Sequence, residues 1–354
     1  MTEHDPPLAE ATDEPVEEAA RPDVVPSDPP GLVATASGSS ESSPSSTPQD
    51  EVEVGPRTRV IAIVNQKGGV GKSTTAVSLG AALAEDGARV LVVDLDPQGN
   101  ASTGLGIRHV AREVSTYEVV LAQARIEDGI VQTAVDGLDA VPSTIDLAGA
   151  EIELVSQFSR ESRLARALEP IRRGRYDFVL MDCPPSLGLL TINALTAADE
   201  VLVPIQCEYY ALEGLGQLLR NVRLVQQNVN SNLRLSGIVM TMFDSRTRLA
   251  EQVVEEVRRY FGRRVYDSII PRTVRLSEAP GYGQPITVYD PGSRGAKAYR
   301  ALAREVLTRE VERDVPGAPG VPDVADLPEV IQPREAPPPE ERAKRKVFGR
   351  RRRE

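Results

Sequence analysis

The chain has 354 residues and a formal net charge of −11. Its charge is uneven: residues 1–55 hold thirteen acids and one base, a net of −12, so residues 56–354 carry +1. The negative net charge of the whole chain therefore gives no argument against an anionic partner for residues 56–354. The two cysteines, Cys183 and Cys207, lie far apart and fit neither a disulfide framework nor a Cys-x-x-Cys metal site.

Composition divides the chain into three parts. Residues 1–55 are rich in Pro and Ser and lack aromatic side chains, so they cannot bury enough apolar surface to offset chain entropy, and we expect disorder. Residues 312–354 are also Pro-rich and end in a basic cluster, 342–353, and we expect disorder there too. The remaining 56–311 have the size of one domain. With no signal peptide and no membrane-length apolar run, the protein is expected to be soluble and cytoplasmic.

Short apolar runs alternate with helical patterns in the expected domain. The β-branched run Val60–Val64 predicts a strand buried on both faces, a helix follows over Lys72–Glu85, and Val90–Val93 predicts the next strand. Later elements are expected in this order: helix 150–168, strands 178–181 and 201–203, helix 213–227, strand 237–242, and helices 249–261 and 293–308. This alternation predicts an α/β fold with a doubly wound, mostly parallel sheet and helices on both faces. Ligands of such sheets bind at the carboxyl ends of the strands.

A glycine-rich loop, residues 65–74, lies between the first expected strand and the first expected helix. Its glycines allow successive backbone N–H groups to surround a phosphate. Lys72 can neutralise the terminal phosphate oxygens, and the Ser73 hydroxyl is placed for Mg²⁺. The expected nucleotide contacts are Lys67, Gly68, Gly69, Val70, Gly71, Lys72, Ser73 and Thr74. Gln66 stands where the standard P-loop pattern has glycine.

Two expected strand ends supply the acids that an ATP–Mg²⁺ site needs. Asp182 follows four apolar residues and is predicted to bind Mg²⁺ through water. Asp94 follows the strand Val90–Val93 and is also assigned to the metal site. A helix cap or turn acid is the alternative for either aspartate. It has more weight for Asp94, because Asp96 lies only two residues away and such close acids rarely have equal duties.

The loop resembles the deviant Walker A motif of the ATPase family that includes ParA, MinD and the nitrogenase iron protein. In that family the extra lysine, here Lys67, reaches across a dimer to the partner's nucleotide, which implies a homodimer that forms on ATP binding. A cation at the loop tip would offset the charge of two facing nucleotides. Residues 93–100 resemble the switch I segment of ParA proteins. The resemblance implies that Asp96 orients or activates the attacking water, so Lys67 and Asp96 are the expected catalytic residues.

Segments 203–214, 270–280 and 289–296 resemble chromosomal ParA/Soj proteins in particular. The resemblance covers nearly all of 57–311. It implies an ATPase that is weak alone, binds double-stranded DNA non-specifically as an ATP-bound dimer, and is stimulated by a ParB-type protein at centromere-like sites. That cycle would move replicated origins apart on the nucleoid. The resemblance also places Pro271 beside the adenine.

Residues 246–275 hold eight arginines and four acids, a local net of +4. Arg246, Arg272 and Arg275 lie in expected loops beside family motifs and are the predicted DNA contacts, because phosphate contacts give salt-dependent, sequence-tolerant binding. For Arg258 and Arg259, the sequence is equally compatible with DNA contact and with ion pairs along a charged helix face. The basic cluster 342–353 could add DNA affinity as a tethered polycation or could act only as a solubilising end.

Three alternative functions are disfavoured. A MinD-like membrane cycle needs an amphipathic C-terminal helix, but residues 341–354 offer only Val347 and Phe348 as large apolar side chains, so no membrane insertion is expected. An iron–sulfur protein would need a ligand loop that neither cysteine has. A non-hydrolysing adaptor is disfavoured by the intact Lys67 and Asp96.

Overall fold

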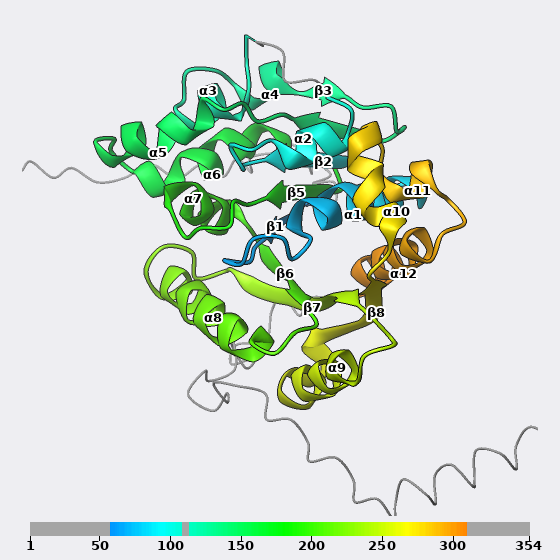
Figure 1. Ribbon diagram of the computed structural model, residues 1–354. Helices are drawn as coiled ribbons and strands as arrows, with labels where there is room; N and C mark the ends of the chain where they lie inside the picture. The colour runs from blue at the N-terminus through cyan, green and yellow to red at the C-terminus, as the bar shows by residue number, and fades with distance from the viewer. Residues whose placement is uncertain (1–56, 108–112, 310–354) are drawn as a thin grey trace, which may run out of the picture. The chain divides into compact units, whose positions relative to one another are not determined.

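The computed structural model describes residues 57–107 and 113–309 (Figure 1). The chain divides into two units, Met1–Val52 and Glu53–Glu354, and every described residue belongs to the second. The sequence expectations for 1–55 and 312–354 therefore lie outside the described residues. Among the described helices, none is long and apolar enough to cross a membrane.

Eight strands form one sheet in the spatial order β3-β4-β2-β5-β1-β6-β7-β8. Their bounds are β1 Arg59–Ile63, β2 Val90–Asp94, β3 Val131–Gln132, β4 Leu138–Val141, β5 Phe178–Asp182, β6 Glu200–Gln206, β7 Arg234–Phe243 and β8 Val265–Pro271. All neighbouring pairs are parallel except β3 with β4. From β1 the chain adds β2, β3 and β4 on one side, returns to place β5 between β2 and β1, and then adds β6, β7 and β8 on the other side. This confirms the doubly wound, mostly parallel sheet.

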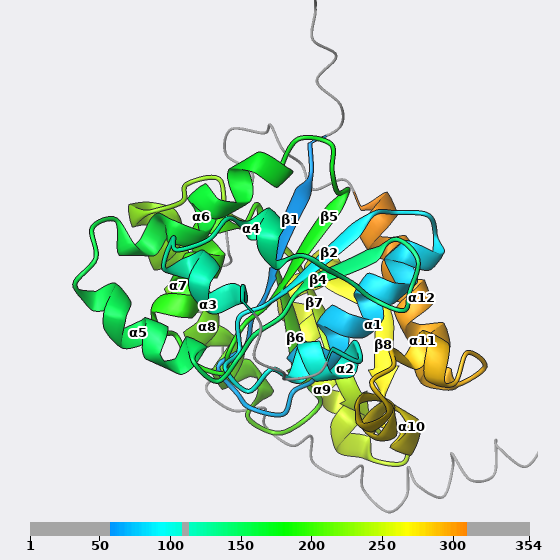
Figure 2. The same cartoon turned by 90° about the horizontal axis from the view of Figure 1, so that it is seen from above.

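Helices cover both faces of this sheet (Figure 2). One face is covered by α1, α2, α11 and α12 and the other by α3 to α9, because their buried residues belong to two separate cores. The helix bounds are α1 Lys72–Glu85, α2 Asn100–Gly104, α3 Thr116–Val120, α4 Ile126–Gly129, α5 Leu147–Val155, α6 Arg163–Leu168, α7 Leu189–Ala197, α8 Ala211–Asn228, α9 Arg248–Phe261, α10 Val274–Glu278, α11 Ile286–Tyr289 and α12 Arg294–Thr308. Short 3-10 turns are η1 Arg160–Ser162, η2 Glu169–Ile171, η3 Gly262–Arg264 and η4 Ala279–Tyr282.

The central strands are apolar throughout because alternate side chains enter different cores. In β1, Val60 and Ala62 pack on the α3–α9 side, whereas Ile61 and Ile63 pack on the α1–α12 side. Strand β1 is thus buried on both faces, as its continuous apolar run predicts.

The single helix expected over 150–168 is wrong. The segment contains α5 and α6, separated by a loop in which Ser159 has a left-handed φ of 49°. Helix α7 stabilises this break through Asn193, whose amide nitrogen donates to the Arg160 carbonyl at 2.8 Å and whose oxygen accepts from the Leu164 N–H at 3.2 Å. These bonds come from a distant part of the chain, so local periodicity does not reveal them.

Candidate functional site

The phosphate loop ends at the N-terminus of α1 with two left-handed glycines, Gly69 at φ 75° and Gly71 at φ 91°. Gly71 is the N-cap of α1 and has no side chain to cap the helix, so the first N–H groups remain available to an anion. Two neighbouring strands hold the loop. Asn65 donates to the Pro204 carbonyl of β6 at 2.7 Å, and Thr241 of β7 donates to the Val70 carbonyl at 2.8 Å.

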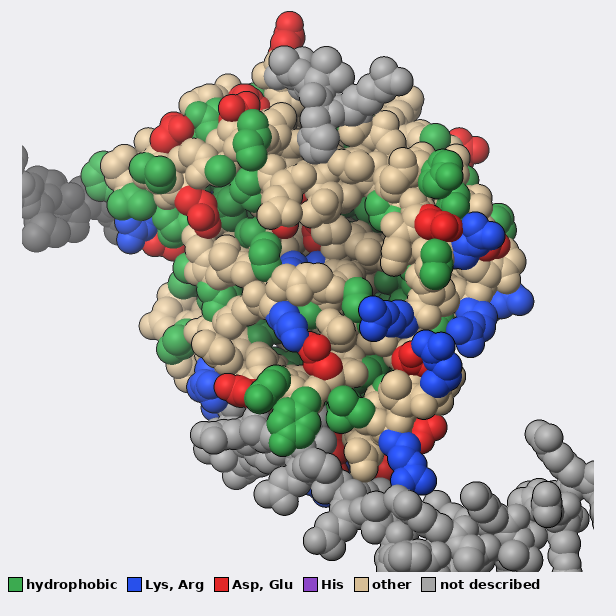
Figure 3. Space-filling model, viewed as in Figure 1, with side chains coloured by type: hydrophobic (Ala, Val, Ile, Leu, Met, Phe, Trp, Pro, Cys, Tyr) green, Lys and Arg blue, Asp and Glu red, His purple; other side chains and the backbone are tan. Residues whose placement is uncertain are grey.

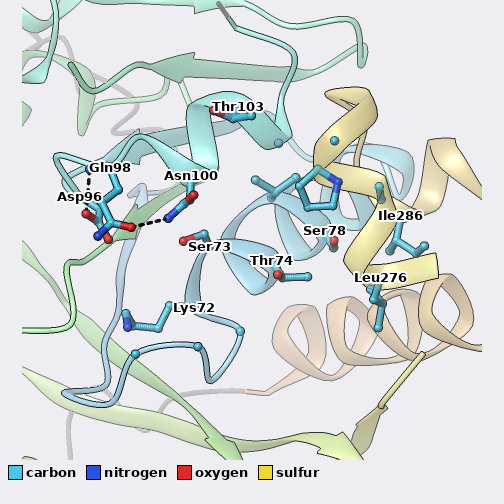
Figure 4. Close-up of a pocket in the computed structure, with 18 of the residues that line it drawn as sticks. Lys72, Ser73, Thr74, Ser78, Asp96, Gln98, Asn100, Thr103, Leu276 and Ile286 are labelled. Atoms are coloured by element: carbon cyan, nitrogen blue, oxygen red, sulfur yellow. Dashed lines mark hydrogen bonds between the residues drawn. The ribbon is translucent and has the colours of Figure 1, made fainter. Parts of the chain in front are cut away.

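A cavity of about 460 Å³ opens beside this loop, a size typical of small-molecule sites (Figure 4). Six of the eight expected nucleotide contacts line it: Gly68, Gly69, Gly71, Lys72, Ser73 and Thr74. The β2–α2 connection supplies Asp96 and Gln98, and α2 begins with Asn100 at the cavity. The opposite wall comes from α10, η4, α11 and the turn between η4 and α11, through Leu276, Ala279, Pro280, Gln284 and Ile286. Sequence reasoning did not identify this second wall, although part of it lies in the family-like segment 270–280.

Lys72 is a buried cation at the floor of the loop. Its Nζ donates to the Lys67 carbonyl at 3.2 Å. Burial lowers the pKa of Lys72, while the nearby carboxylate of Asp182 opposes that change. A desolvated ammonium gains most from a neighbouring anion, and phosphate oxygens would supply that charge.

Asp182, the last residue of β5, is fully buried, and neither of its carboxylate oxygens has a hydrogen-bond partner among the described residues. Burial raises its pKa well above the usual range, and the charge of Asp94 adds to this. The Ser73 hydroxyl, which lies nearby without completing a hydrogen bond, and the Lys72 ammonium oppose the rise in pKa. Leaving a buried carboxylate unpartnered is costly, and a divalent cation would remove that cost. No cluster of three or more His, Cys, Asp or Glu ligands occurs within 57–107 and 113–309. Mg²⁺ suits such a site because it keeps waters and phosphate oxygens as ligands.

Asp94 is equally buried, but its oxygens are engaged. One oxygen accepts from the backbone N–H and the hydroxyl of Ser102, at 2.8 and 2.7 Å, and the other accepts from the Asp96 N–H at 3.1 Å. Burial raises the pKa of Asp94 to about 6. This bonding favours the alternative of a turn acid that shapes the β2–α2 connection, and the assignment of Asp94 as a metal residue stays a prediction.

We expect Ser102→Ala to destabilise the protein by about 1–3 kcal/mol, because Asp94 would lose a buried donor. The same hydroxyl accepts from the Ser143 N–H at 3.1 Å, so a second buried group would also lose its partner. The free energy of unfolding in urea measures this effect. Thr308→Ala is the matched control, because its exposed hydroxyl bonds only to carbonyls of its own helix and its removal should change stability by less than about 0.5 kcal/mol. An equal loss of unfolding free energy in both variants would contradict the structural role of the Ser102 hydroxyl at Asp94.

Asp96 is buried at the cavity wall, where Figure 4 draws it beside Gln98. Its Oδ1 accepts from the Gln98 N–H at 3.0 Å, and the Gln98 side chain accepts from Asn100 at 3.4 Å. The pairing of β2 with β5 places Asp94 opposite Asp182, so the acids expected from two separate strand ends do meet at one edge of the sheet.

Lys67 does not line the cavity beside its own loop. Its side chain is 52% exposed and forms an ion pair with Glu208 in the connection between β6 and α8. Sequence reasoning assigned no role to Glu208, although it lies in the family-like segment 203–214. Pro271 ends β8 and also does not line the cavity, so its adenine contact stays a prediction.

The three predicted DNA-binding arginines lie near the carboxyl ends of β7 and β8, on the same edge of the sheet as the cavity. The Arg272 N–H donates to the Phe243 carbonyl at 2.9 Å, and Asp244 pairs with Arg246 at 2.6 Å. Hydrogen bonding and charge from Arg246, with a smaller contribution from Arg272, lower the pKa of Asp244. Arg275 pairs with Glu278 and Asp290 at 3.1 and 3.5 Å. In Figure 3, Lys and Arg side chains gather on this side of the molecule.

Arg258 and Arg259 have a different environment near the C-terminus of α9. Arg258 lies 3.8 Å from an Asp267 carboxylate oxygen, and Arg259 pairs with Glu256 at 2.7 Å along the helix. Arg246 and Arg275 also pair with acids, so ion pairing does not distinguish the two groups of arginines. Both interpretations of Arg258 and Arg259 therefore stay open.

Comparisons with known proteins agree with this geometry. Residues 58–235 match the family described as AAA domain. The chain is 59% identical over 248 residues to the sporulation initiation inhibitor protein Soj of Bacillus subtilis, covering 70% of this chain and 98% of Soj. It is 53% identical over 261 residues to the chromosome partitioning protein ParA of Caulobacter vibrioides, covering 73% and 98%.

A solved structure of similar fold is titled cobyrinic acid a,c-diamide synthase from Mycobacterium smegmatis, with bound ATP analog and magnesium. It is 44% identical to this chain with a TM-score of 0.62, and the match covers 71% of this chain and 94% of that one. The family-like segments of the sequence, the phosphate loop with its buried acids, and relatives above 50% identity over about 70% of this chain all agree. The chain therefore belongs to the ParA/Soj family of chromosome-partitioning ATPases.

Proposed function

We propose that this protein is an ATP-dependent switch that dimerises, binds double-stranded DNA without sequence preference, and segregates chromosome origins with a ParB-type partner. Its cofactors are ATP and Mg²⁺, and its reaction is ATP hydrolysis. The observation that carries the proposal is a nucleotide-sized cavity beside a cationic phosphate loop, together with the buried Asp182, whose carboxylate accepts no hydrogen bond from the described residues. The proposal includes a cytoplasmic location on the nucleoid.

Each wall of the cavity has a distinct part in this proposal. Lys72 and the free N–H groups of α1 would hold the phosphates, while Ser73 and Asp182 would hold Mg²⁺, Asp182 through water. The bound metal ion would neutralise charge on the terminal phosphates. Asp96 would orient the attacking water, and Asp94 would hold Asp96 in place through the backbone bond between them.

Lys67 would act only in the dimer. Its side chain is half exposed, lies outside its own cavity and is paired with an acid that is itself partly exposed. An exposed ion pair contributes only about 0–1 kcal/mol, so a facing nucleotide could displace Glu208 from Lys67. This supports a role for Lys67 at the partner's phosphates.

DNA would bind along the arginine edge. We expect Arg246→Glu combined with Arg272→Glu to weaken DNA binding strongly and to leave ATP-driven dimerisation intact. A plot of log affinity against log salt concentration has a negative slope. The steepness of that slope should decrease by about 2 for each subunit engaged, because each lost phosphate contact releases about one counterion fewer. Anisotropy of labelled random-sequence DNA with ATP, with ADP and without nucleotide, at several salt concentrations, measures this effect.

Arg258→Glu combined with Arg259→Glu is the matched control, because it makes the same charge change on exposed arginines near the start of β8, away from the carboxyl ends of the strands. DNA affinity that falls equally in both double variants would show that only net charge matters. If the Arg246→Glu, Arg272→Glu variant kept DNA binding and a chain shortened to end at residue 312 lost it, the DNA contact would be assigned to residues 313–354.

A further inference from the structure

Two left-handed glycines stand where two walls of the cavity touch. Gly106 lies two residues beyond α2 with a φ of 74°, and Gly283 directly follows η4 with a φ of 64°. Each glycine closes a turn, because the Gly106 N–H donates to the Thr103 carbonyl and the Gly283 N–H donates to the Pro280 carbonyl, both at 3.0 Å. Thr103, labelled in Figure 4, and Pro280 line the cavity, so each turn belongs to one of its walls.

The backbones of these two turns are too close to admit a side chain at either glycine. A Cβ on Gly283 would lie 2.7 Å from the Cα of Gly106, and a Cβ on Gly106 would lie 2.9 Å from the Gly283 carbonyl oxygen. The obstructing atoms belong to the backbone, so no side chain can rotate out of the way. Carbon atoms in contact normally lie about 3.5–4.0 Å apart, so a side chain at Gly283 would push the turns apart by about 1 Å.

Neither turn is free to yield. Leu105 and Ile107 flank Gly106 and are buried, and Ala279 and Ile286 of the other wall are buried as well. All four side chains belong to the same core, on the α1–α12 side of the sheet. A close-packed core transmits a displacement instead of absorbing it. A side chain at either glycine would therefore shift the walls of the cavity themselves.

The α2 turn is also connected to the acids of the site. Ser102 donates its N–H and its hydroxyl to Asp94, at 2.8 and 2.7 Å, and Asp94 accepts from the Asp96 N–H at 3.1 Å. The Ile107 N–H in turn donates to the Ser102 carbonyl at 3.0 Å. A continuous series of hydrogen bonds thus runs from the residue after Gly106 to Asp96.

We propose that Gly106 and Gly283 are positioning residues for ATP hydrolysis. Their contact fixes the separation between the α2 wall and the 279–286 wall, so that a nucleotide held by the phosphate loop meets the second wall and Asp96 together. Neither glycine lines the cavity, so both act through the walls and not by touching the nucleotide. The inference rests on the proposed role of Asp96 but not on dimerisation or DNA binding.

The first test is Gly283→Ala. Both the Mg–ATP affinity and the hydrolysis rate at saturating ATP should fall, and kcat/KM should fall by about 10- to 100-fold, the effect expected when part of a site is displaced by about 1 Å. Gly174→Ala is the matched control, because Gly174 has a φ of 76° but a Cβ there meets no described atom within 4 Å. Both variants place alanine in left-handed backbone, so strain alone would affect them alike. Only Gly283→Ala should change the ATP parameters per folded molecule, with the folded fraction measured by urea unfolding.

Inorganic tripolyphosphate with Mg²⁺ separates a displaced wall from a damaged phosphate loop. This ligand lacks the base and the sugar, so it needs the loop and Mg²⁺ but not the 279–286 wall. Calorimetric titration should give it the same affinity for Gly283→Ala as for the wild type. Gly106→Ala approaches the same contact from the other side and should give the same pattern, which keeps the test decisive if Gly283→Ala does not fold.

Hydrogen exchange of the wild-type protein tests the contact without any substitution. Mg–ATP should slow the exchange of amides in both 102–107 and 279–284, because neither turn can open while the other is held. Protection of only one segment, wild-type ATP parameters in Gly283→Ala, an equal effect of Gly174→Ala, or an equal loss of tripolyphosphate affinity would each overturn the proposal. If Asp96→Ala hydrolyses ATP normally while Gly283→Ala still loses ATP affinity, the proposed role of Asp96 fails and the wall contact stands.

Discussion

The Lys72→Ala protein should remain folded and lose ATP binding, with affinity at least about 100-fold weaker, equivalent to about 2.7 kcal/mol. The Lys72 ammonium is buried beside Asp182 and Asp96, whose charges both act on its pKa. Without this cation, the phosphates would approach those two carboxylates with only Mg²⁺ and the backbone N–H groups of the loop to offset the negative charge. Repulsion between buried like charges is strong because water does not screen it.

Calorimetric titration with Mg–ATP measures this loss, and thermal unfolding without nucleotide checks that the variant is folded. Lys297→Ala is the matched control, because Lys297 is an exposed lysine of α12 outside the cavity. Unchanged ATP affinity in Lys72→Ala would remove the phosphate-loop interpretation altogether.

Asp96→Ala should separate nucleotide binding from hydrolysis. The variant should still bind Mg–ATP, because Lys72, Ser73 and Asp182 are unaffected. The bond from the N–H of residue 96 to Asp94 should persist, whereas the bond that Asp96 Oδ1 accepts from the Gln98 N–H is lost. Hydrolysis should fall by about 10²–10⁴-fold, the usual contribution of a positioned general base, so the ATP-bound dimer should persist on DNA.

Light scattering with ATP, DNA co-sedimentation and phosphate release together test this expectation. Asp136→Ala removes an exposed acid from the loop between β3 and β4 and should behave like the wild type in all three measurements. A monomeric Asp96→Ala protein that stays off DNA and hydrolyses ATP at the normal rate would contradict the proposed switch.

Local pattern in the sequence was sufficient for the five central strands of the sheet, β2, β5, β1, β6 and β7, and for the phosphate loop, but not for β3, β4 and β8. The runs at β1, β2 and β5 predict strands because they are apolar and short, and their burial in the sheet follows from that composition. Gly69 and Gly71 mark the loop because left-handed φ values are accessible to glycine without steric cost. Strand β8 was not predicted, because Asp267 and Ser268 interrupt its apolar run. Their N–H groups bond to the Glu305 carboxylate of α12, 37 or more residues away in sequence.

Only the tertiary structure showed how differently the two strand-end acids are bonded. Asp94 and Asp182 each end a strand, yet Ser102 and Asp96 satisfy the carboxylate of Asp94, while that of Asp182 accepts no hydrogen bond from the described residues. The difference arises because parallel strands 88 residues apart bring the two side chains to one edge, where only one of them meets the N-terminus of α2. Hydrogen-bond satisfaction at a buried carboxylate is a property of neighbours in space, and those neighbours exist only once the sheet has assembled.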